Sequence, residues 1–414
     1  MKLALNTLTL ATLAALAPAA HAEIFIDQIG NSEVSFEGLI QADYNYFDSD
    51  YVQLGCDGTI SGSNCTNTIN SGDGLDGDFA IRRAEIIMKG KGPGMWNWVL
   101  GYDAKDQKFL DANISYRFSG FTTLTVGQFK QPNSFEELTS TRHNDFIAKA
   151  MTTNMQGIAR RTGVQLSTGG DNWTVAASYF DDELSRNRAQ GAGYGLRGTF
   201  APILSDGNIL HLGLSYVDFD CENNVGQPRC GLSVRPDADL AATQLINTGT
   251  FTDGDKVNTT GLEGVLVKGP FKIQSEYMTT TISRDLNPNF KGDSWYVYGV
   301  WNLTGETWAY KSGLTTTNLP NNPDKGMWQL GVRYDTADLN DGSVNFANPS
   351  SPVVTGVMGG KESNWTLGVN WYWRSNFKFS ANYVMVDSTK YSSSLKLFND
   401  DNPNIFELRA QFYW

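Results

Sequence analysis

Apolar and polar side chains alternate along most of this chain, in segments of about ten residues. The clearest case is WTLGVNWYWR, which begins at Trp365, where every second residue is apolar and the residues between are mostly small or polar. Side chains that alternate with a period of two lie on opposite faces of a β-strand. The pattern therefore predicts strands with one apolar and one polar face.

Sixteen segments follow this pattern, and the connections between them differ in length. The predicted strands span 34–47, 78–90, 94–104, 108–118, 121–130, 157–168, 171–181, 191–201, 208–219, 258–268, 271–284, 291–304, 326–336, 361–374, 376–388 and 403–414. Most connections alternate between tight turns, such as Gly92-Pro93-Gly94, and long loops, such as 131–156. Two connections break the rule, because 105–107 is short where a long loop is expected and 305–325 is long where a turn is expected.

An even number of antiparallel strands with short turns at one end and long loops at the other is typical of an outer-membrane β-barrel. A soluble β-sandwich would not explain why the apolar faces end in aromatic residues such as Trp373 and Trp414. The sequence thus predicts an all-β fold, a 16-stranded antiparallel transmembrane outer-membrane β-barrel. A barrel of that size is wide enough to hold water, so we expect the polar face to line a channel.

The start of the chain predicts export. Residues 1–22 contain Lys2, an apolar stretch and the small-residue ending Ala20-His21-Ala22, which indicate a secretory signal peptide. Residues 23–414 are then expected to form a single β-barrel domain in the outer membrane. The formal net charge of −12 argues against a nucleic-acid partner, since such proteins are usually basic.

The composition gives little basis for catalysis. Beyond the predicted signal peptide the sequence has only two histidines, His143 and His211, and neither lies in a recognisable motif. Histidine serves most acid–base and metal chemistry, so we expect no enzyme, no cofactor and no metal site. A barrel enzyme and an adhesin that binds through its outer loops remain as less favoured alternatives.

Four cysteines form two local pairs, each nine positions apart in a polar stretch. Because an exported chain meets an oxidising compartment, we predict the disulfides Cys56–Cys65 and Cys221–Cys230. A metal site is the alternative, but this spacing is not typical of metal ligands.

The phase of each predicted strand shows which charged residues lie on its polar face. Asp111 and Arg117 share one such face, and Arg161, Arg197 and Arg333 lie on three others. Rings of arginine in a pore favour anions and phosphates. Alternatively, each arginine pairs with a carboxylate across the barrel and only adds rigidity. The sequence leaves both readings open.

Arg82 and Arg83 are adjacent, so strict alternation cannot place both on the polar face. Either one of them faces a subunit interface, or a β-bulge turns it inward. A charge that faced lipid at mid-depth would cost roughly 2–4 kcal/mol.

The long loop 131–156 contains Ser134 and Glu137 at the spacing of a capping box. This spacing predicts a short helix. The position of the loop after the fifth segment makes a constriction folded into the pore the favoured interpretation over a plain surface loop.

Several short stretches occur in a characteristic order along the mature chain. They are LIQADY from Leu39, FAIRRA from Phe79, GQFK from Gly127 with EELTS from Glu136, RGTFAP from Arg197, LTGE from Leu303, VRYD from Val332 and TLGVNWY from Thr366. No single stretch is specific, but together the chain resembles the phosphate-selective porin family, porins O and P. The resemblance implies a sixteen-stranded homotrimer whose pores pass anions through an arginine ladder.

The resemblance also implies site residues. The paired arginines that contact the anion in phosphate-selective members match Arg82 and Arg83 of this chain, and the lumen aspartate of the phosphate site matches Asp111. The hydroxyl residues of the constriction loop match Ser140 and Thr141.

Two positions depart from the family pattern. Glu137 stands where the family has the lysine that grips phosphate, and Leu39 stands where it has an upstream ladder arginine. A carboxylate in place of a cation repels an anion by roughly a few kcal/mol at intermediate dielectric. We therefore expect Glu137 to weaken the affinity for phosphate.

The sequence as a whole predicts an outer-membrane porin that forms a water-filled channel for passive diffusion of small hydrophilic solutes. Anions such as phosphate or polyphosphate are the favoured class. Its expected partners are outer-membrane lipid, those solutes and further copies of the chain in a homotrimer. The alternative is a general or cation-tolerant diffusion porin with no phosphate site.

Overall fold

The computed structural model describes most of the chain. The described residues are 24–29, 32–48, 78–185, 191–221, 230–241 and 243–414. The predicted signal peptide, residues 1–22, and the predicted disulfide Cys56–Cys65 lie outside them. Within the described residues, no helix is both long and apolar enough to cross a bilayer.

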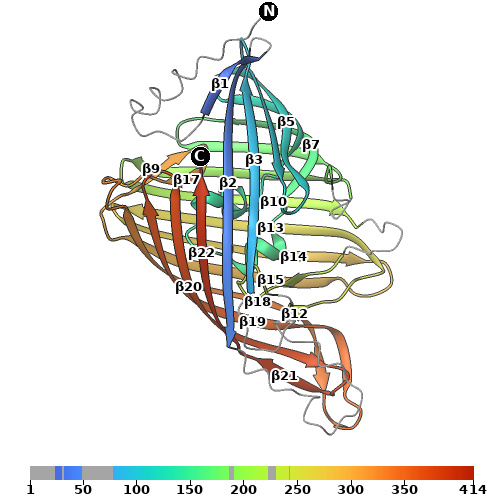
Figure 1. Cartoon of the computed structure of the whole chain (residues 1–414). Coiled ribbons are helices and arrows are strands. Elements are labelled where there is room, and N and C mark those ends of the chain that lie inside the picture. The colour runs from blue at the N-terminus through green and yellow to red at the C-terminus, as the bar shows by residue number, and fades with distance from the viewer. Residues whose placement is uncertain (1–23, 30–31, 49–77, 186–190, 222–229, 242) are drawn as a thin grey trace, which may run out of the picture.

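Sixteen antiparallel strands form one closed barrel (Figure 1). They are β2 (Ser32–Asp48), β3 (Asp78–Lys91), β4 (Trp96–Asp103), β5 (Lys108–Ser119), β6 (Thr122–Lys130), β7 (Arg160–Gly169), β8 (Trp173–Phe180), β9 (Gly193–Ser205), β10 (Asn208–Asp220), β13 (Gly254–Lys268), β14 (Phe271–Arg284), β15 (Phe290–Asn302), β18 (Met327–Asn345), β19 (Val353–Trp373), β20 (Phe377–Ser392) and β22 (Asn404–Tyr413). β22 pairs with β2, where Gln411 lies opposite Gln41, and this pairing closes the barrel. Each predicted segment overlaps one of these strands, so the predicted fold is confirmed.

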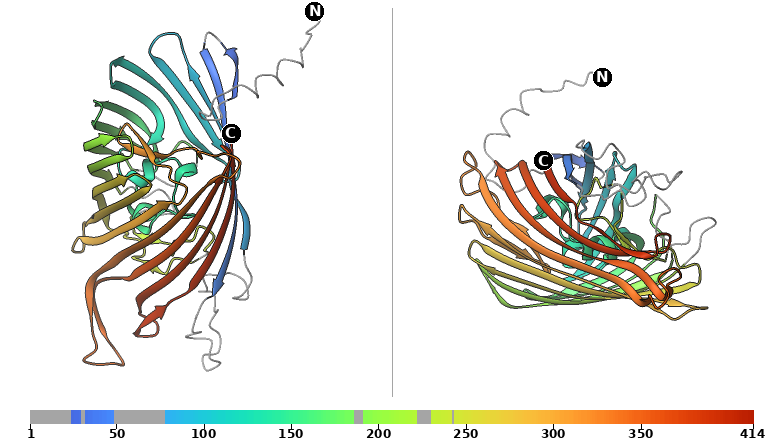
Figure 2. Two further views of the ribbon diagram at one scale, coloured as in Figure 1. Left: turned by 90° about the vertical axis from the view of Figure 1, so that its left-hand side faces the viewer. Right: turned by 90° about the horizontal axis from the view of Figure 1, so that it is seen from below.

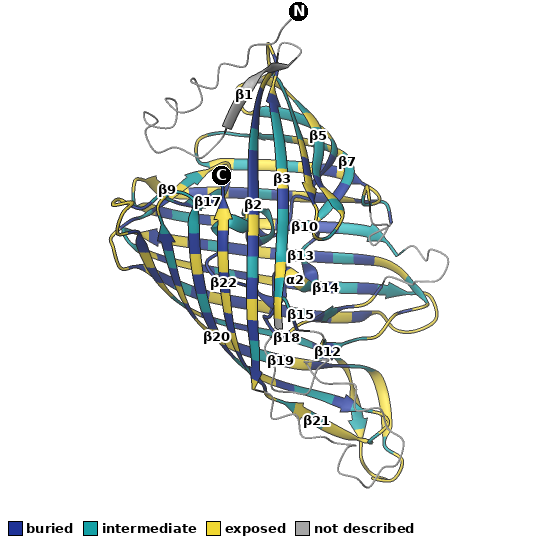
Figure 3. Ribbon diagram, in the orientation of Figure 1, coloured by how far each residue is buried: buried dark blue, intermediate teal, exposed yellow. Residues whose placement is uncertain are grey.

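The alternation in the sequence becomes an alternation in burial along the strands (Figure 3). On β19 the side chains of Trp365, Leu367 and Val369 are exposed on the outside of the barrel, whereas those of Asn364 and Thr366 are buried inside it. Apolar side chains on the outside can contact lipid, and closure leaves no strand edge unpaired in the hydrocarbon. The polar face therefore lines the lumen.

Some strands continue beyond the barrel wall. β18 and β19 remain paired up to Asn345 and Val353 at the long-loop end, well past the predicted ends of these segments. β21 (Leu397–Asp401) extends the same end by pairing with β20, and β1 (Ile24–Ile29) pairs with the start of β2 at the other end. Outside the membrane no lipid enforces alternation, so the sequence pattern does not reveal these extensions.

The loop after β6, residues 131–159, folds into the barrel (Figure 2) and is called the constriction loop below. It contains α1 (Phe135–Leu138), the 3-10 turn η2 (Thr141–His143) and α2 (Met151–Gln156). The hydroxyl of Ser134 accepts a hydrogen bond from the backbone N–H of Glu137 at 3.1 Å, as the capping-box spacing predicts.

Strands on the other side of the barrel hold the middle of this loop. Asp145 binds Lys272 of β14 and accepts a hydrogen bond from the hydroxyl of Tyr298 on β15 at 2.9 Å. The guanidinium of Arg333 on β18 donates to the carbonyl of Ala148 at 2.9 Å. Because these strands lie far from β6 around the barrel, the loop crosses the lumen and narrows it.

The connection after β15, which is unexpectedly long for a turn, also folds inward. It forms the internal hairpin, made of β16 (Trp308–Lys311) and β17 (Leu314–Thr317). The hydroxyl of Tyr310 lies 2.8 Å from Nδ1 of His211 on β10, and Arg197 on β9 donates to the carbonyl of Gly313 at 3.0 Å. The additional residues therefore fill the lumen beside these strands.

The long loop between β10 and β13 contributes a third inserted segment. Its described residues 231–241 and 243–253, called the aspartate loop below, contain β11 (Ser233–Val234) paired with β12 (Ile246–Asn247). Val234 and Ile246 are buried in an apolar cluster with Met151 of the constriction loop. This packing anchors the aspartate loop against the constriction loop.

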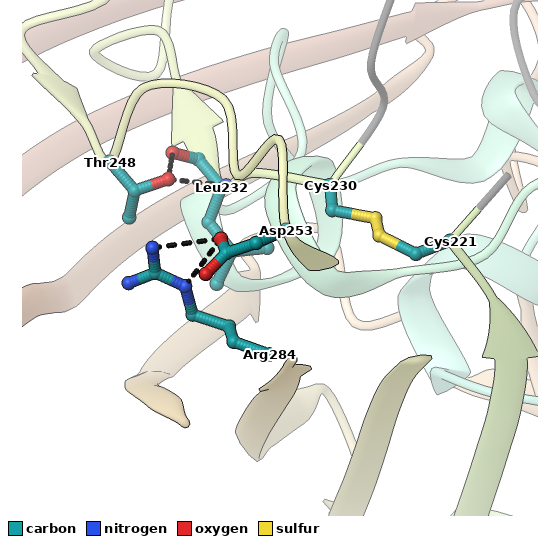
Figure 4. The surroundings of a disulfide bond; sticks show 6 residues. All are labelled: Cys221, Cys230, Leu232, Thr248, Asp253 and Arg284. Atoms are coloured by element: carbon teal, nitrogen blue, oxygen red, sulfur yellow. Dashed lines mark hydrogen bonds and ion pairs between the residues drawn. A yellow bond between two sulfur atoms is a disulfide. The ribbon is translucent and has the colours of Figure 1, made fainter. Parts of the chain in front are cut away.

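The predicted disulfide Cys221–Cys230 is present at the base of the aspartate loop (Figure 4). Close to it, the guanidinium Nε of Arg284 at the end of β14 donates to Asp253 at 2.9 Å. The disulfide joins the start of the loop to the residue that follows β10, whereas the ion pair lies at the end of the loop, next to β13.

Candidate functional site

Two cavities lie between the inserted loops and the barrel wall. The inner cavity, of about 450 Å³, lies between the constriction loop and the wall formed by β2 to β7. Its charged lining residues are Glu37, Glu85, Lys89, Asp111, Lys130, Arg142 and Arg160. The outer cavity, of about 310 Å³, lies among the aspartate loop, α2 and β3. Its lining residues are Arg82, Asn154, Ser233, Val234, Arg235, Ala238, Asp239 and Gln244.

Glu37 of β2 holds two cations at the inner cavity. One oxygen of its carboxylate binds Lys89 of the neighbouring strand β3. The other oxygen accepts a hydrogen bond from the guanidinium of Arg142 in η2, at 2.6 Å. One negative charge on the wall is therefore shared by two positive groups.

Glu137, which the sequence places in the phosphate site, is held in the same way. Its carboxylate lies 2.5 Å from the ammonium group of Lys149 and 3.8 Å from that of Lys130. Burial raises the pKa of Glu137, but Lys149 and Lys130 lower it by more, so that its pKa falls to about 2. The charge that was expected to repel an anion is ionised, and it is neutralised by two lysines.

Two further ion pairs complete the cluster around the inner cavity. Arg160 at the start of β7 donates to Asp111 of β5 at 2.7 Å, and Arg83 of β3 lies 3.0 Å from Glu85. A guanidinium held by a carboxylate keeps further N–H groups for a second acceptor, because it carries five donors.

The cluster as a whole is positive. Glu37 and Glu137 each hold two cations, whereas Asp111 and Glu85 each hold one. Counted formally, the six basic and four acidic side chains of this cluster leave an excess of two positive charges, and the residues that line the cavity itself leave an excess of one. A charge excess of one sign in a cleft with low-dielectric walls concentrates ions of the opposite sign.

A β-bulge in β3 explains how the adjacent residues Arg82 and Arg83 can both face the lumen. Gln41 of β2 lies opposite Arg83, and the next residue, Ala42, lies opposite Ile81, so that Arg82 is an extra residue without an opposite partner. The bulge lets both guanidinium groups reach the lumen, since Arg82 borders the outer cavity and Arg83 binds Glu85 at the inner one.

Two arginines meet one loop carboxylate at the outer cavity. Oδ2 of Asp239 lies 3.1 Å from Nε of Arg82 and 3.2 Å from the guanidinium of Arg409 on β22. Arg409 also donates two hydrogen bonds to the wall carboxylate of Asp43, at 2.7 and 2.6 Å. The aspartate loop therefore supplies the carboxylate that pairs with Arg82.

Two arginines predicted to line the pore are enclosed instead. Arg197 donates to Glu263 of β13 at 2.5 Å beneath the internal hairpin. Arg333, only 1% exposed, lies between Asp237 of the aspartate loop and Asp335. Neither arginine borders the inner or the outer cavity. Their geometry fits the reading in which arginine–carboxylate pairs add rigidity.

The other predicted residues lie in different parts of the barrel. Ser140 and Thr141 border the inner cavity, as does Leu39. Arg161 is buried and donates to the carbonyl of Arg160. Arg117 is exposed close to the turn that follows β5.

The sequence did not single out Arg160, Lys130, Lys149, Arg142 or Lys89. Strand phase assigns the polar face to Arg161 and not to Arg160, but Arg160 is the first residue of β7 and turns inward as the chain leaves the constriction loop. Lys149 and Arg142 lie in that loop, where no alternation exists to give a phase. Their only sequence signal is their position within the long loop.

Known proteins resemble this chain over most of its length. Residues 64–414 match the family described as "Phosphate-selective porin O and P". The chain is 27% identical to Porin O of Pseudomonas aeruginosa over 428 residues, which cover 92% of this chain and 89% of that protein.

Solved structures share the fold at low sequence identity. The outer membrane channel DcaP of Acinetobacter baumannii superposes with a TM-score of 0.55 at 10% identity, covering 94% of this chain and 99% of that chain. An anion-selective porin from Comamonas acidovorans gives 0.52 at 12% identity, covering 92% and 100%. The sixteen-stranded barrel and the family match together show that this chain is an outer-membrane porin and belongs to the phosphate-selective porin O and P family.

Proposed function

We propose that this porin conducts small anions, inorganic phosphate among them, through the inner cavity along the wall of β2 to β7. The observation that carries the proposal is the positive excess around this cavity, where Glu37 and Glu137 each hold two cations. Basic groups in a narrow lumen attract anions and repel cations. The neutralisation of Glu137 by Lys130 and Lys149 removes the main objection raised by the sequence.

The side chains at this cavity suit an oxyanion. Arg160 on the wall and Arg142 in the constriction loop offer guanidinium N–H groups, and Ser140 and Thr141 of the same loop offer hydroxyls. Such donors match the oxygens of phosphate. Each of the two arginines also holds a carboxylate, so a passing anion shares donors with a partner already present. Sharing of this kind limits the affinity, and conduction requires a site that the ion can leave.

The similar proteins support this class of solute. The matched family is described as phosphate-selective, and one protein of the same fold is described as an anion-selective porin. We assign the barrel a transport role and not a catalytic one, because the family and the fold are those of a channel.

We also propose that the porin assembles as a homotrimer in outer-membrane lipid. OmpT of Vibrio cholerae, which shares the fold at 12% identity, is described in a trimer form. Native mass spectrometry of the detergent-extracted protein tests this, and a monomeric mass would contradict it.

Single-channel recordings in planar lipid bilayers test the conduction of anions. In a KCl gradient, the reversal potential of the wild type should lie close to the equilibrium potential of chloride. Inorganic phosphate should reduce the chloride current. Arg160→Gln removes one cation of the inner cavity and should weaken both effects. Arg117→Gln is the matched control, because Arg117 lies near a turn and does not border either cavity.

The alternative is a cation-tolerant diffusion porin without a phosphate site. It is favoured by the three carboxylates Glu37, Glu85 and Asp111, which border the same cavity. A reversal potential close to the equilibrium potential of potassium, with no effect of phosphate on the current, would establish this alternative and reject the proposed function.

A further inference from the structure

Asp239 occupies the place where an anion would bind in the outer cavity. Arg409 on β22 donates a hydrogen bond to its Oδ2 atom at 3.2 Å, and Nε of Arg82 on β3 lies 3.1 Å from the same atom. Two arginines from different strands that converge on one oxygen are the usual receptor for an oxyanion. Arg82 and Asp239 both line the outer cavity, and each side chain is partly exposed.

The two carboxylates around Arg409 differ in how they are held. Asp43 belongs to the wall strand β2, is 1% exposed and makes two hydrogen bonds to Arg409. Asp239 belongs to the aspartate loop, and its side chain is 20% exposed. Asp43 is thus a fixed partner of Arg409, whereas Asp239 is a partly hydrated group carried by a loop.

The attachment of the loop keeps Asp239 close to the arginines. Val234 and Ile246, which flank this part of the loop, are buried in an apolar cluster. The guanidinium of Arg235 donates to the carbonyl of Asp239 at 3.3 Å. A ligand tethered in this way competes at a high effective concentration with any solute of the lumen.

We propose that Asp239 is a tethered internal ligand of the site formed by Arg82 and Arg409, and that a permeating oxyanion must displace it. This inference rests on the proposed conduction of anions and adds a residue that determines specificity. A doubly charged oxyanion brings more charge and more acceptor oxygens to the two guanidinium groups than chloride does. The carboxylate therefore excludes chloride from this site more strongly than it excludes hydrogen phosphate.

The tether also lowers the affinity for every anion. The apparent dissociation constant rises in inverse proportion to the fraction of time for which the binding site is free. If Asp239 leaves the two arginines for about a tenth of the time, the apparent dissociation constant is about tenfold higher than that of the free site. Burial raises the pKa of Asp239, but Arg82 and Arg409 lower it by more, so the carboxylate stays ionised at neutral pH.

The test measures how inorganic phosphate inhibits the chloride current of single channels. In Asp239→Asn the site is no longer occupied by a charged ligand, so the half-inhibiting phosphate concentration should fall about tenfold. Asp239→Glu keeps the charge and should stay near the wild type. Asp253→Asn removes a carboxylate from the same loop, but Asp253 pairs with Arg284 (Figure 4) and borders neither cavity, so this variant should also stay near the wild type.

The outcomes separate this inference from the function on which it rests. If the wild type is anion-selective and Asp239→Asn leaves the phosphate inhibition unchanged, or if Asp253→Asn shifts it equally, the internal ligand is rejected and the anion channel is not. If the wild type is not anion-selective, the proposed function itself is rejected. Asp239→Ser provides the same measurement should Asp239→Asn fail to assemble, and a tenfold fall in that variant supports the inference equally.

Discussion

The carboxylate of Glu276 on β14 accepts a hydrogen bond from the backbone N–H of Phe135, the first residue of α1, at 2.9 Å. It also accepts hydrogen bonds from the N–H of Glu136 at 2.8 Å and from the hydroxyl of Ser134 at 3.2 Å. Three donors at the start of α1 thus converge on one wall residue. The constriction loop is thereby fixed to a strand remote from β6 and β7, which flank it.

Replacement of this acceptor should loosen the constriction loop. Glu276→Gln turns one acceptor oxygen into an amide donor that faces backbone N–H groups. A buried donor left without a partner costs roughly 1–3 kcal/mol, so we expect the loop to detach transiently from β14. Single-channel recordings should show a larger and noisier open-channel current.

Asp293→Asn is a suitable comparison for this variant, because Asp293 on β15 binds the hydroxyl of Tyr277 at an exposed position. It should leave the current quiet. A quiet current of wild-type size in Glu276→Gln as well would show that the other contacts of the loop suffice to hold it.

The pKa of Glu137 predicts how selectivity depends on pH. Because its pKa is lowered from 4.5 to about 2, the carboxylate stabilises the folded loop above pH 4.5, and this contribution is lost as the pH falls toward 2. Glu137→Gln removes the charge that Lys130 and Lys149 share, so anion selectivity should increase at neutral pH. The increase should appear as a larger reversal potential in a KCl gradient.

The difference in reversal potential between wild type and Glu137→Gln isolates this residue from the other carboxylates of the wall. It should be constant from neutral pH down to about pH 4.5 and should vanish as the wild-type carboxyl becomes protonated near pH 2. A difference that vanished already near pH 4.5 would mean that the two lysines do not hold the carboxylate.

The strands could be predicted from sequence because contact with lipid determines which face of each strand points outward. Every residue that faces hydrocarbon must be apolar, so Leu367 and Val369 reveal the phase of β19 without any knowledge of its neighbours. The same reasoning could only present alternatives for Arg82 and Arg83. The bulge depends on how β3 pairs with Gln41 and Ala42 of β2, and this register is not a local property of the sequence.

The charges of the site were harder to predict, for a related reason. Asp239 meets Arg82 although 157 positions separate them in the sequence, and loop residues such as Lys149 have no strand phase. A carboxylate that faces an anion pathway looks unfavourable until its partners are known. Glu137 illustrates this, because its two lysines come from β6 and from the far side of the constriction loop.

The disulfide at the base of the aspartate loop should contribute stability and not conductance. Cys221 and Cys230 are nine positions apart, and closing a loop of that size stabilises a fold by roughly 2–3 kcal/mol. The double variant Cys221→Ser/Cys230→Ser should therefore unfold at a lower urea concentration than the wild type. Neither cysteine borders the inner or the outer cavity, so the single-channel current of the double variant should be unchanged. An altered current would mean that the disulfide positions Asp239.

Trp308 should determine whether the internal hairpin stays inside the barrel. Its side chain is 2% exposed, packs in the cluster that contains Phe135 and Tyr298, and lies beneath the ammonium group of Lys272 at 5.3 Å. Truncation of a buried tryptophan costs about 3–5 kcal/mol. In Trp308→Ala the hairpin should leave the lumen for part of the time, so conductance should rise and a protease should cleave within residues 308–317.

Trp328→Ala provides the control for this experiment, because it removes the same side chain from the outer face of β18, where Trp328 is exposed. That variant loses contact with lipid but leaves the hairpin in place, so its conductance and protease resistance should match the wild type. Equal effects of the two substitutions would indicate a general weakening of the barrel. An effect confined to Trp308→Ala would identify the hairpin as a plug that narrows the pore from the turn side.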